Sequence, residues 1–329
     1  MTDISQDTRR RLGALLLGAH LRHLRECQNL TPADVAARVP GPHRLDADGV
    51  SDVEAGRTPV PGSARLGRLG SVLRACGAGR IALADYHRVV AACLREGLGP
   101  VLTDDALAWP HRYQVLEQGA ARVLLTAFAN LPGPLRTAQT WAAMWMEGDC
   151  ADPVPREGTS PVLAMVPAAG CEVCVAYRAD LLAQPGTAAR WQRAVAEARA
   201  DTFDKRIRRE DGPETILLLD EGVLHRRGGS ARAHAAQMGH LADLTRHTRL
   251  LVRVVPFNSG AMLRGEKAEL DLGGGRTVTA SLGDAGVSYR DGPHPGLRFA
   301  LERSLDPDVS GDLLDKAAAG TLRLPRRGW

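Results

Sequence analysis

One stretch near the N-terminus, LTPADVAARVPGPHRLDADGVSDVEAG, constrains the fold of this chain more than any other. Thr31 is a favourable helix N-cap, Pro32 suits the first helical position, and Asp34 stands where a capping-box acid reaches back to the cap. Val35 and Val39 follow at helical spacing and give the segment one apolar face. The first half of the stretch therefore predicts a short helix with a defined start.

The second half of the stretch predicts another short helix after a turn. Asp46 is its expected N-cap and Gly56 its expected stop. An amphipathic helix is also predicted upstream, because three leucines recur there at helical spacing. Together the three segments have the pattern of a helix-turn-helix. The upstream leucines are Leu17, Leu21 and Leu24.

The segments LGAHLRHLREC, LTPADVAARV and VSDVEAGR resemble the DNA-binding domain of Xre-type, lambda-repressor-like regulators. The resemblance implies an all-α head whose third helix enters the major groove of DNA. Two features depart from the family. The turn from Pro40 to Arg44 is longer than usual, and Asp46 replaces the usual Ser at the N-cap of the recognition helix.

The positions of the recognition helix that the resemblance places in the major groove include two acids and no basic residue; they are Ala47, Asp48, Gly49, Ser51 and Asp52. Affinity for DNA comes mainly from phosphate neutralisation, and specific base contacts come mainly from Arg, Lys, Asn and Gln. An Asp accepts a hydrogen bond from a cytosine amine, but its charge also repels phosphates. Two interpretations stay open, DNA contact and a head that serves as a dimerisation module or scaffold. The candidate DNA-binding residues are Thr31, Arg44, Ala47, Asp48, Ser51 and Arg57.

The net charge of +4 is concentrated in the N-terminal region. The first 80 residues hold twelve Arg and eight acidic residues, so the remainder is close to neutral. A basic module on a neutral body fits a nucleic-acid-contacting head. It fits equally well the Arg-rich helical surfaces that are common in proteins from high-GC bacteria.

The sequence contains no apolar run of about 18 residues and no signal-peptide pattern at its N-terminus. We therefore expect a cytoplasmic protein with no membrane association and with its six cysteines reduced. Cys171 and Cys174 form a single CxxC without a second pair, so a structural role is favoured over half a zinc site or a redox pair. We expect no metal and no cofactor.

The pattern changes from helical to mixed near residue 100, where a Gly- and Pro-rich cluster ends the last helix of the head. We predict an all-α head over residues 1–100 and an α/β (α+β) domain over residues 101–329, with an insertion at 148–182. An apolar run at 215–219 predicts a buried strand in that domain. Further strands are predicted at 250–255, 268–272, 277–282 and 287–289, and helices at 231–248 and 308–319.

The segments LEQGAARVLLTAFANLPGPLRTAQTWA, ETILLLDEGVLHRR and LLVRVVPFNSGAM resemble the C-terminal domain of actinobacterial antitoxin-like Xre regulators, the WhiJ-like group. The resemblance implies a homodimeric regulator that binds double-stranded DNA and a small partner protein or metabolite. It also implies a role in development or secondary metabolism. Arg136 departs from the family, which has Gln at this position of its turn.

The positions that match the family define a candidate ligand or partner pocket. Loops that gather at strand ends on a rigid sheet often form such sites. In the alternative interpretation these residues form a structural turn, with the two acids capping a helix or forming ion pairs. The candidate residues are Phe128, Pro132, Arg136, Asp220, Glu221, His225 and Phe257.

Catalytic chemistry has less support. Asp220 and Glu221 beside His225 are residue types that perform acid–base work, but adjacent residues of a strand point to opposite faces. No nucleophile elbow, phosphate loop or zinc-protease motif is present. We assign no catalytic residues and leave enzymatic activity open, with the balance against it. Three residues of the predicted helix 231–248 share a face that fits either a metal edge or, more simply, a solvated surface: His240, Asp243 and His247.

The sequence therefore favours a DNA-binding transcriptional regulator whose C-terminal domain senses a small molecule or a small partner protein. The first alternative is a biosynthetic enzyme or accessory protein with a vestigial helix-turn-helix. The acidic recognition helix, the longer turn and the insertion favour that alternative. The second alternative is an antitoxin-like interaction protein.

Overall fold

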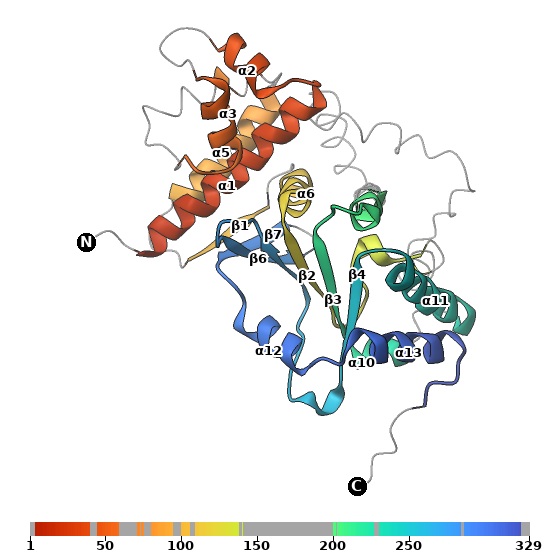
Figure 1. Cartoon of the computed structure of the whole chain (residues 1–329). Coiled ribbons are helices and arrows are strands. Elements are labelled where there is room, and N and C mark those ends of the chain that lie inside the picture. Colours follow the sequence, from red (N-terminus) through yellow and green to blue (C-terminus); the bar gives the residue numbers. More distant parts are fainter. Residues whose placement is uncertain are drawn as a thin grey trace, which may run out of the picture. The chain divides into compact units, whose positions relative to one another are not determined.

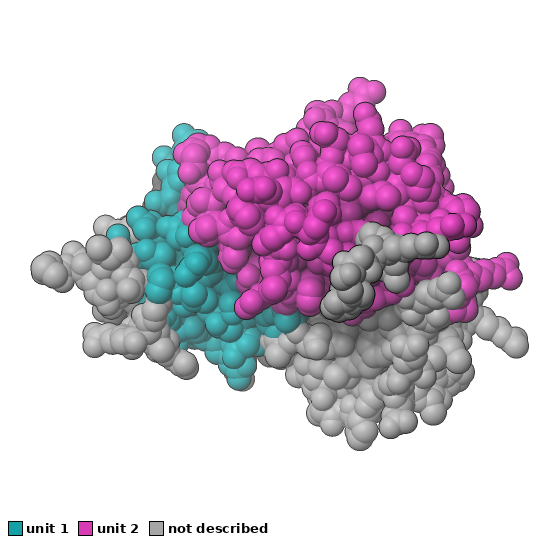
Figure 2. Space-filling view, turned by 90° about the horizontal axis from the view of Figure 1, so that it is seen from below, with its two compact units in different colours: residues 1–119, 159–195, 283–291 teal, residues 120–158, 196–282, 292–329 magenta. Residues whose placement is uncertain are grey.

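The computed structural model describes residues 4–39, 45–58, 71–72, 74–75, 80–94, 100–105, 109–137, 140, 200–201, 203–226, 230–283 and 286–323. The described elements form two compact units. Figure 1 labels their helices and strands. The first takes its elements from residues 1–119 and 283–291, and the second from residues 120–158, 196–282 and 292–329. Figure 2 marks the two units on the molecular surface.

The N-terminal part of the first unit contains four helices whose bounds lie within the described residues. Helix α1 packs against α5, and the leucines at 17, 21 and 24 are all at most 4 % exposed, which confirms the predicted amphipathic helix. Tyr86 and Val89 of α5 are also buried. The four helices are α1 (Ile4–Cys27), α2 (Pro32–Arg38), α3 (Ala47–Glu54) and α5 (Arg80–Leu94).

The same unit contains a two-stranded ladder and a further helix. Strand β1 (Val101–Asp104) pairs antiparallel with β7 (Gly286–Asp291), so that Leu102 lies opposite Tyr289 in the core. Helix α6 (Trp109–Gly119) packs on α1 and β7. Elements on both sides of the predicted domain boundary at residue 100 therefore belong to one compact unit. That residues 1–100 form a separate domain stays a prediction.

The second unit is built on a mixed sheet in the order β6-β5-β2-β3-β4. Strands β2, β3 and β4 run parallel to one another. Strand β5 runs antiparallel to β2, and β6 runs antiparallel to β5. Strand β3 has five consecutive buried residues, as expected for a strand covered on both faces. The strands are β2 (Arg122–Ala127), β3 (Glu214–Asp220), β4 (Leu250–Val255), β5 (Glu266–Asp271) and β6 (Thr277–Gly283).

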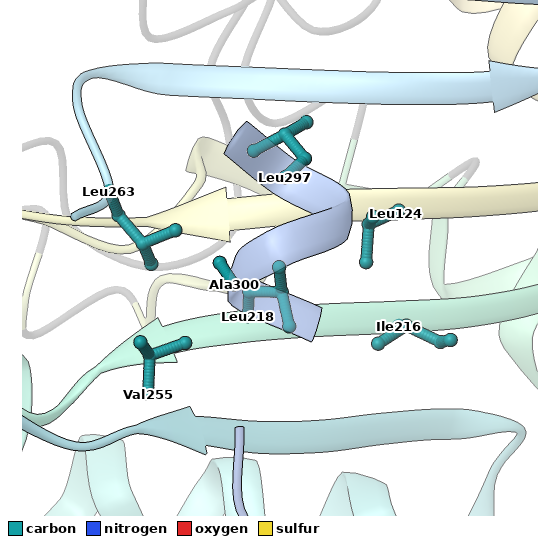
Figure 3. Packing of buried hydrophobic residues seen from close by; sticks show 7 residues of the cluster. All are labelled: Leu124, Ile216, Leu218, Val255, Leu263, Leu297 and Ala300. Atoms are coloured by element: carbon teal, nitrogen blue, oxygen red, sulfur yellow. The ribbon is translucent and has the colours of Figure 1, made fainter. Parts of the chain in front are cut away.

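Helix α12 (Pro295–Arg303) covers one face of this sheet (Figure 3). Leu297 and Ala300 of the helix meet residues from three strands, and complete burial of one such leucine contributes roughly 1.5–3 kcal/mol. The sequence reading missed this helix. Its segment, HPGLRFALER, begins with residues typical of turns, and its apolar residues do not define one clear face. In the structure, the largest of them, Phe299, is 42 % exposed. The strand residues of the cluster include Leu124, Ile216, Leu218 and Val255.

Strand β4 is the last strand of the sheet, and the connection between α12 and α13 (Pro307–Ala318) covers part of its edge. The Val254 N–H donates to Ser310 Oγ at 3.0 Å, and the Leu305 N–H donates to the Val254 carbonyl at 2.8 Å. Helix α11 (Ala231–His247) packs beside α13 (Figure 1). These contacts satisfy part of an edge that would otherwise offer backbone groups for pairing.

The fold class predicted from the sequence is confirmed, with a helical N-terminal region followed by mixed β and α structure. Every predicted strand from 215 to 289 is present within one or two residues, as are the helices at 231–248 and 308–319. The predicted insertion at 148–182 lies outside the described residues, together with Cys171 and Cys174.

Candidate DNA interface and strand-end site

Helix α2 starts with the capping box expected from the sequence. The Thr31 side chain accepts from the Asp34 N–H at 3.2 Å, and the Asp34 carboxylate accepts from the Thr31 N–H at 2.8 Å. Thr31, a candidate DNA contact, thus holds the start of the helix. Asp46 caps α3 in the same way, because its Oδ1 accepts from the Gly49 N–H at 2.7 Å.

Two glycines let α3 approach α1 closely. A Cβ on Gly18 of α1 would lie 2.3 Å from the Val53 carbonyl oxygen, so only glycine fits there. Gly56 ends α3 with φ at +62°, and a Cβ on it would lie 2.6 Å from the Leu15 Cα. Glycine is therefore required at both positions, and the predicted helix stop at Gly56 is confirmed.

A largely buried ion pair connects α3 to α1. Arg25 donates from Nε and Nη2 to the two carboxylate oxygens of Glu54, at 2.6 and 2.9 Å, and its Nη1 donates to the Leu30 carbonyl at 2.7 Å. The two side chains are 11 % and 8 % exposed. A bidentate pair with so little solvent access fixes geometry better than a surface pair does. Arg25 is therefore a structural residue of the helix-turn-helix.

The outward surface of α3 is less acidic than its sequence indicates. Asp46 is committed to the helix cap, and Asp52 forms an ion pair with Arg57 at 2.7 Å. Ser51 donates its hydroxyl to the Ala47 carbonyl of its own helix at 2.9 Å. Asp48 is exposed and stands at the first turn. Arg44, the remaining candidate contact in the turn, lies outside the described residues.

Several arginines of the first unit form ion pairs with acids of the same unit or are buried. Arg22 pairs with Glu26 at 2.8 Å, and Arg11 pairs with Asp291 at 3.2 Å. Arg9 is 2 % exposed and donates to the Ala92 carbonyl. Fewer arginines can therefore reach DNA phosphates than the sequence count implies.

The first unit contains a buried polar cluster around Arg112 that the sequence did not predict. Arg112 of α6 is fully buried and donates from Nε and Nη2 to Asp104 of β1, at 2.6 and 2.8 Å. Its Nη1 lies 2.6 Å from Asp85 Oδ2 of α5 and 3.1 Å from His20 Nδ1 of α1. Four elements thus meet on one guanidinium. No local sequence pattern predicts this cluster, because its members are single polar residues that lie far apart in the chain, on three helices and one strand.

Burial also controls the histidines near this cluster. Desolvation, reinforced by the positive charge of Arg112, holds the pKa of His20 well below its ordinary value. Desolvation likewise lowers the pKa of His23 to about 4, although Glu26 acts in the opposite direction. His23 stacks on His111 with 4.5 Å between ring centroids. Both His20 and His23 are therefore neutral at physiological pH.

In the second unit, the chain turns at Asp220, which corrects one expectation. The sequence predicts that Asp220 and Glu221 are neighbours on a strand, but Asp220 ends β3 and caps the short helix α10 (Glu221–His225). Its Oδ1 accepts from the Gly222 N–H at 2.8 Å. Burial raises the pKa of Asp220, while the Gly222 hydrogen bond and Arg226 oppose that change. Asp220 therefore caps a helix, which is the alternative role predicted for these acids.

The candidate pocket residues do gather at the ends of parallel strands. Glu221 accepts from the Phe257 N–H at 2.8 Å, and thereby joins the segments after β3 and β4. His225 stacks on Phe257 with 6.3 Å between ring centroids. Phe128, after β2, lies under the Arg226 guanidinium, 5.6 Å from ring centroid to Cζ. Phe257 belongs to the short 3-10 helix η4 (Phe257–Ser259).

Two further candidates stabilise the turn after β2. Arg136 donates from Nε to the Leu131 carbonyl at 2.6 Å, around the 3-10 helix η2 (Gly133–Leu135), whose N-cap is the buried Pro132. Gln237 of α11 is 2 % exposed and donates to the Leu135 carbonyl at 2.8 Å. The same amide accepts from the Thr137 N–H at 2.8 Å. Gln237 was not singled out from the sequence, where nothing distinguishes it from a surface glutamine.

Within the described residues, no group of three His, Cys, Asp or Glu side chains is arranged to hold a metal ion. Asp243 and His247 are exposed on α11, as a solvated face requires. Burial lowers the pKa of His240. Among the described cysteines, Cys93 is buried, and burial raises the pKa of its thiol to about 12, which makes it a poor nucleophile.

Two family models match this chain, one in its N-terminal region and one in its C-terminal region. Residues 16–85 match the model of a helix-turn-helix domain, and residues 174–296 match the model of a domain of unknown function (DUF5753). No curated protein and no solved structure matches this chain. The helix-turn-helix domain supports a DNA-binding regulator. In the part of the chain that the structure describes, no helix combines the length and the apolar character needed to cross a membrane.

Proposed function

We propose that this protein is a cytoplasmic, homodimeric Xre-type transcriptional regulator, related to the WhiJ-like group, whose C-terminal domain senses a small partner protein or metabolite. The observation that carries the proposal is the set of described helices of the helix-turn-helix: α2 and α3 are both capped, and the Arg25–Glu54 pair fixes α3 to α1. A helix so placed is the standard element for reading a major groove.

The proposed DNA interface comprises α3 with its flanking residues. Arg57, Ala47 and Ser51 are the positions next to DNA, and Asp48 is the acidic position among them. Because Asp52 is paired with Arg57, α3 opposes phosphates less strongly than three unpaired carboxylates would. Thr31 and Arg44 are proposed to lie at the edge of this interface.

The experiment is a gel shift with the purified full chain and the DNA upstream of its own coding region, at several salt concentrations. A regulator gives a specific complex whose affinity falls as salt rises. No complex even at low salt, where phosphate contacts are strongest, would remove the DNA-binding role.

A second candidate function is a scaffold or dimerisation role for the helix-turn-helix within an accessory or antitoxin-like protein. It is favoured by the composition of α3, which contains no Arg, Lys, Asn or Gln between Ala47 and Glu54. A stable dimer that fails to shift DNA under all conditions would support this second function.

The proposed sensing site consists of the candidate pocket residues of the second unit. Its support is that Phe128, His225 and Phe257 lie at neighbouring strand ends of one sheet, where binding sites commonly form. A role in development or secondary metabolism follows only from the family resemblance, and deletion of the coding sequence with measurement of sporulation and metabolite yield tests it.

A further inference from the structure

The outward face of α3 carries an arginine that belongs to the segment after the helix. Val50 and Val53 are the buried residues of α3, and Asp52 lies about 160° around the helix from Val50, at roughly 100° per residue. Arg57 donates from Nε to Asp52 Oδ1 at 2.7 Å, and its Nη2 lies 2.7 Å from the same oxygen. The guanidinium therefore lies over the face of α3 that is turned away from the core.

The backbone holds Arg57 in the same place. Gly56 adopts a left-handed conformation with φ at +62°, which turns the chain back after α3. The Arg57 N–H then donates to the Asp52 carbonyl at 2.9 Å. Asp52 thus binds both the main chain and the side chain of Arg57, so the arginine is positioned before any ligand arrives. Preorganisation of this kind lowers the entropy that binding costs.

The pair leaves one edge of the guanidinium available. A guanidinium has five N–H groups, and Asp52 binds those on the Nε–Nη2 edge. In the part of the chain that the structure describes, Asp52 is the only group to which the Arg57 side chain bonds. The Arg57 side chain is 63 % exposed, so the two parallel N–H groups of its Nη1–Nη2 edge are open to solvent.

Two parallel donors match one base edge of the major groove. Guanine presents two acceptors there, N7 and O6, whereas adenine presents one acceptor and one donor. A phosphate attracts an unpaired cation more strongly than it attracts Arg57, because the charge of Asp52 opposes that of the arginine. Within α3 itself, no side chain is of the type that commonly donates to guanine, since residues 47–54 include no Arg or Lys.

We infer that Arg57 is the guanine-reading residue of the proposed DNA interface, and that Asp52 is the positioning residue that orients it. The Nη1 and Nη2 N–H groups donate to N7 and O6 of one guanine. The inference rests on the proposed function and deepens it by naming the base that the protein selects. It also gives an acid of α3 a role other than contact with DNA.

The chain offers a matched control in its second unit. Arg209 donates from Nε and Nη2 to the carboxylate of Asp211, at 3.0 and 2.7 Å, and its side chain is 66 % exposed. This pair has the same chemistry and a similar exposure, but it lies outside the helix-turn-helix. Arg209→Ala therefore removes an equivalent exposed arginine without changing the proposed interface.

The experiment selects duplexes from a library with a randomised central segment on the immobilised full chain. Fluorescence anisotropy then compares the best duplex with duplexes that carry A·T in place of each selected G·C pair. We expect at least one guanine to be fixed, and its replacement by adenine to weaken binding about tenfold. This ratio should fall to about twofold or less in the Arg57→Ala protein and stay unchanged in the Arg209→Ala protein.

Variants of Asp52 test positioning separately from affinity. Asp52→Ala removes a carboxylate from the interface and releases the arginine to turn toward phosphates. Affinity for random-sequence duplex should therefore rise slightly, while the preference for guanine falls roughly threefold. Asp52→Asn keeps an oxygen that accepts from Nε and should retain most of the preference. Loss of a residue that only supported the fold would instead weaken binding to every duplex alike.

Three results overturn the inference. They are selected duplexes without a fixed guanine, an unchanged guanine preference in the Arg57→Ala protein, and an unchanged preference in the Asp52→Ala protein. Circular dichroism of each variant shows that its fold is retained. A specific complex without guanine preference removes the role of Arg57 and keeps the regulator. No enriched duplex, together with no gel shift at low salt, removes both proposals.

Discussion

Arg112 of α6 and Asp85 of α5 form a buried ion pair, with 2.6 Å between Nη1 and Oδ2. Arg112 is completely buried, and Asp104 of β1 binds the other side of the same guanidinium. Helices of the helix-turn-helix region are thus joined, by charge, to elements that follow it in the chain. Removal of this cation leaves two buried carboxylates without compensation, which is far more costly than loss of a surface pair.

Substitution Arg112→Met should therefore destabilise the protein by about 3–5 kcal/mol. Urea unfolding of the full chain, followed by circular dichroism, measures the change. Arg22→Met serves as the control, because Arg22 forms a solvated pair with Glu26 on α1 and should cost less than about 1 kcal/mol. Similar losses in both variants would show that the buried cluster contributes no more than a surface pair.

Gly18→Ala should destabilise the first unit and weaken DNA binding, because its Cβ would meet the Val53 carbonyl oxygen at 2.3 Å and push α3 away from α1. Gly311→Ala is the matched change in another helix, α13, where a Cβ meets nothing within 4 Å. There alanine should stabilise by up to about 1 kcal/mol, through helix propensity. Thermal unfolding and the gel shift, applied to both variants, test this contrast. A Gly18→Ala protein as stable as wild type would contradict the close approach.

Stability should decrease in mildly acidic solution because of His20 and His23. Burial lowers the folded-state pKa of both, that of His23 to about 4, whereas in the unfolded chain both titrate near 6.5. Below pH 6.5 the unfolded state gains protons that the folded state does not. The stabilisation is therefore complete above pH 6.5 and is lost progressively toward pH 4, by up to about 1.4 kcal/mol per pH unit for each histidine.

Urea unfolding at a series of pH values measures this slope. His23→Phe should reduce it while keeping a ring stacked on His111. His247→Phe changes an exposed histidine of α11 and should leave the slope as it is. An unchanged slope in the His23→Phe protein would show that this histidine is not the cause.

Asp48→Asn should strengthen DNA binding at low salt several-fold, because it removes a carboxylate from the first turn of α3, which the proposed interface places near the phosphates. Asp308→Asn makes the same change in the first turn of α13 and should have no effect on DNA affinity. Fluorescence anisotropy with a labelled duplex at several salt concentrations measures both. If the two variants behave alike, α3 does not lie against DNA.

Regular elements and helix caps followed from the sequence because their causes are local. The capping box at Thr31 and Asp34, the N-cap at Asp46 and the stop at Gly56 depend on residues within a single turn. The buried strand β3 was visible as an apolar run. Helix α12 was missed, because its burial comes from a sheet face assembled from distant strands.

The candidate sites were only partly predictable. Phe128, His225 and Phe257 were expected to gather, and they do lie at adjacent strand ends. Their roles depended on turns that the sequence does not show, such as the start of α10 at Glu221, which separates that residue from the strand. The buried cluster around Arg112 was not anticipated, since its partners come from positions 20, 85 and 104 of the chain.

The sequence by itself determined the helix-turn-helix, the class of the fold and the acidic composition of α3. Only the tertiary structure decided which charges are available, because pairing between Arg57 and Asp52, between Arg25 and Glu54, and around Arg112 depends on side chains brought together in space. Local patterns specify elements through backbone geometry and periodic burial. The electrostatic character of a surface depends on the ion pairs that folding creates, and these have no signature in one segment alone.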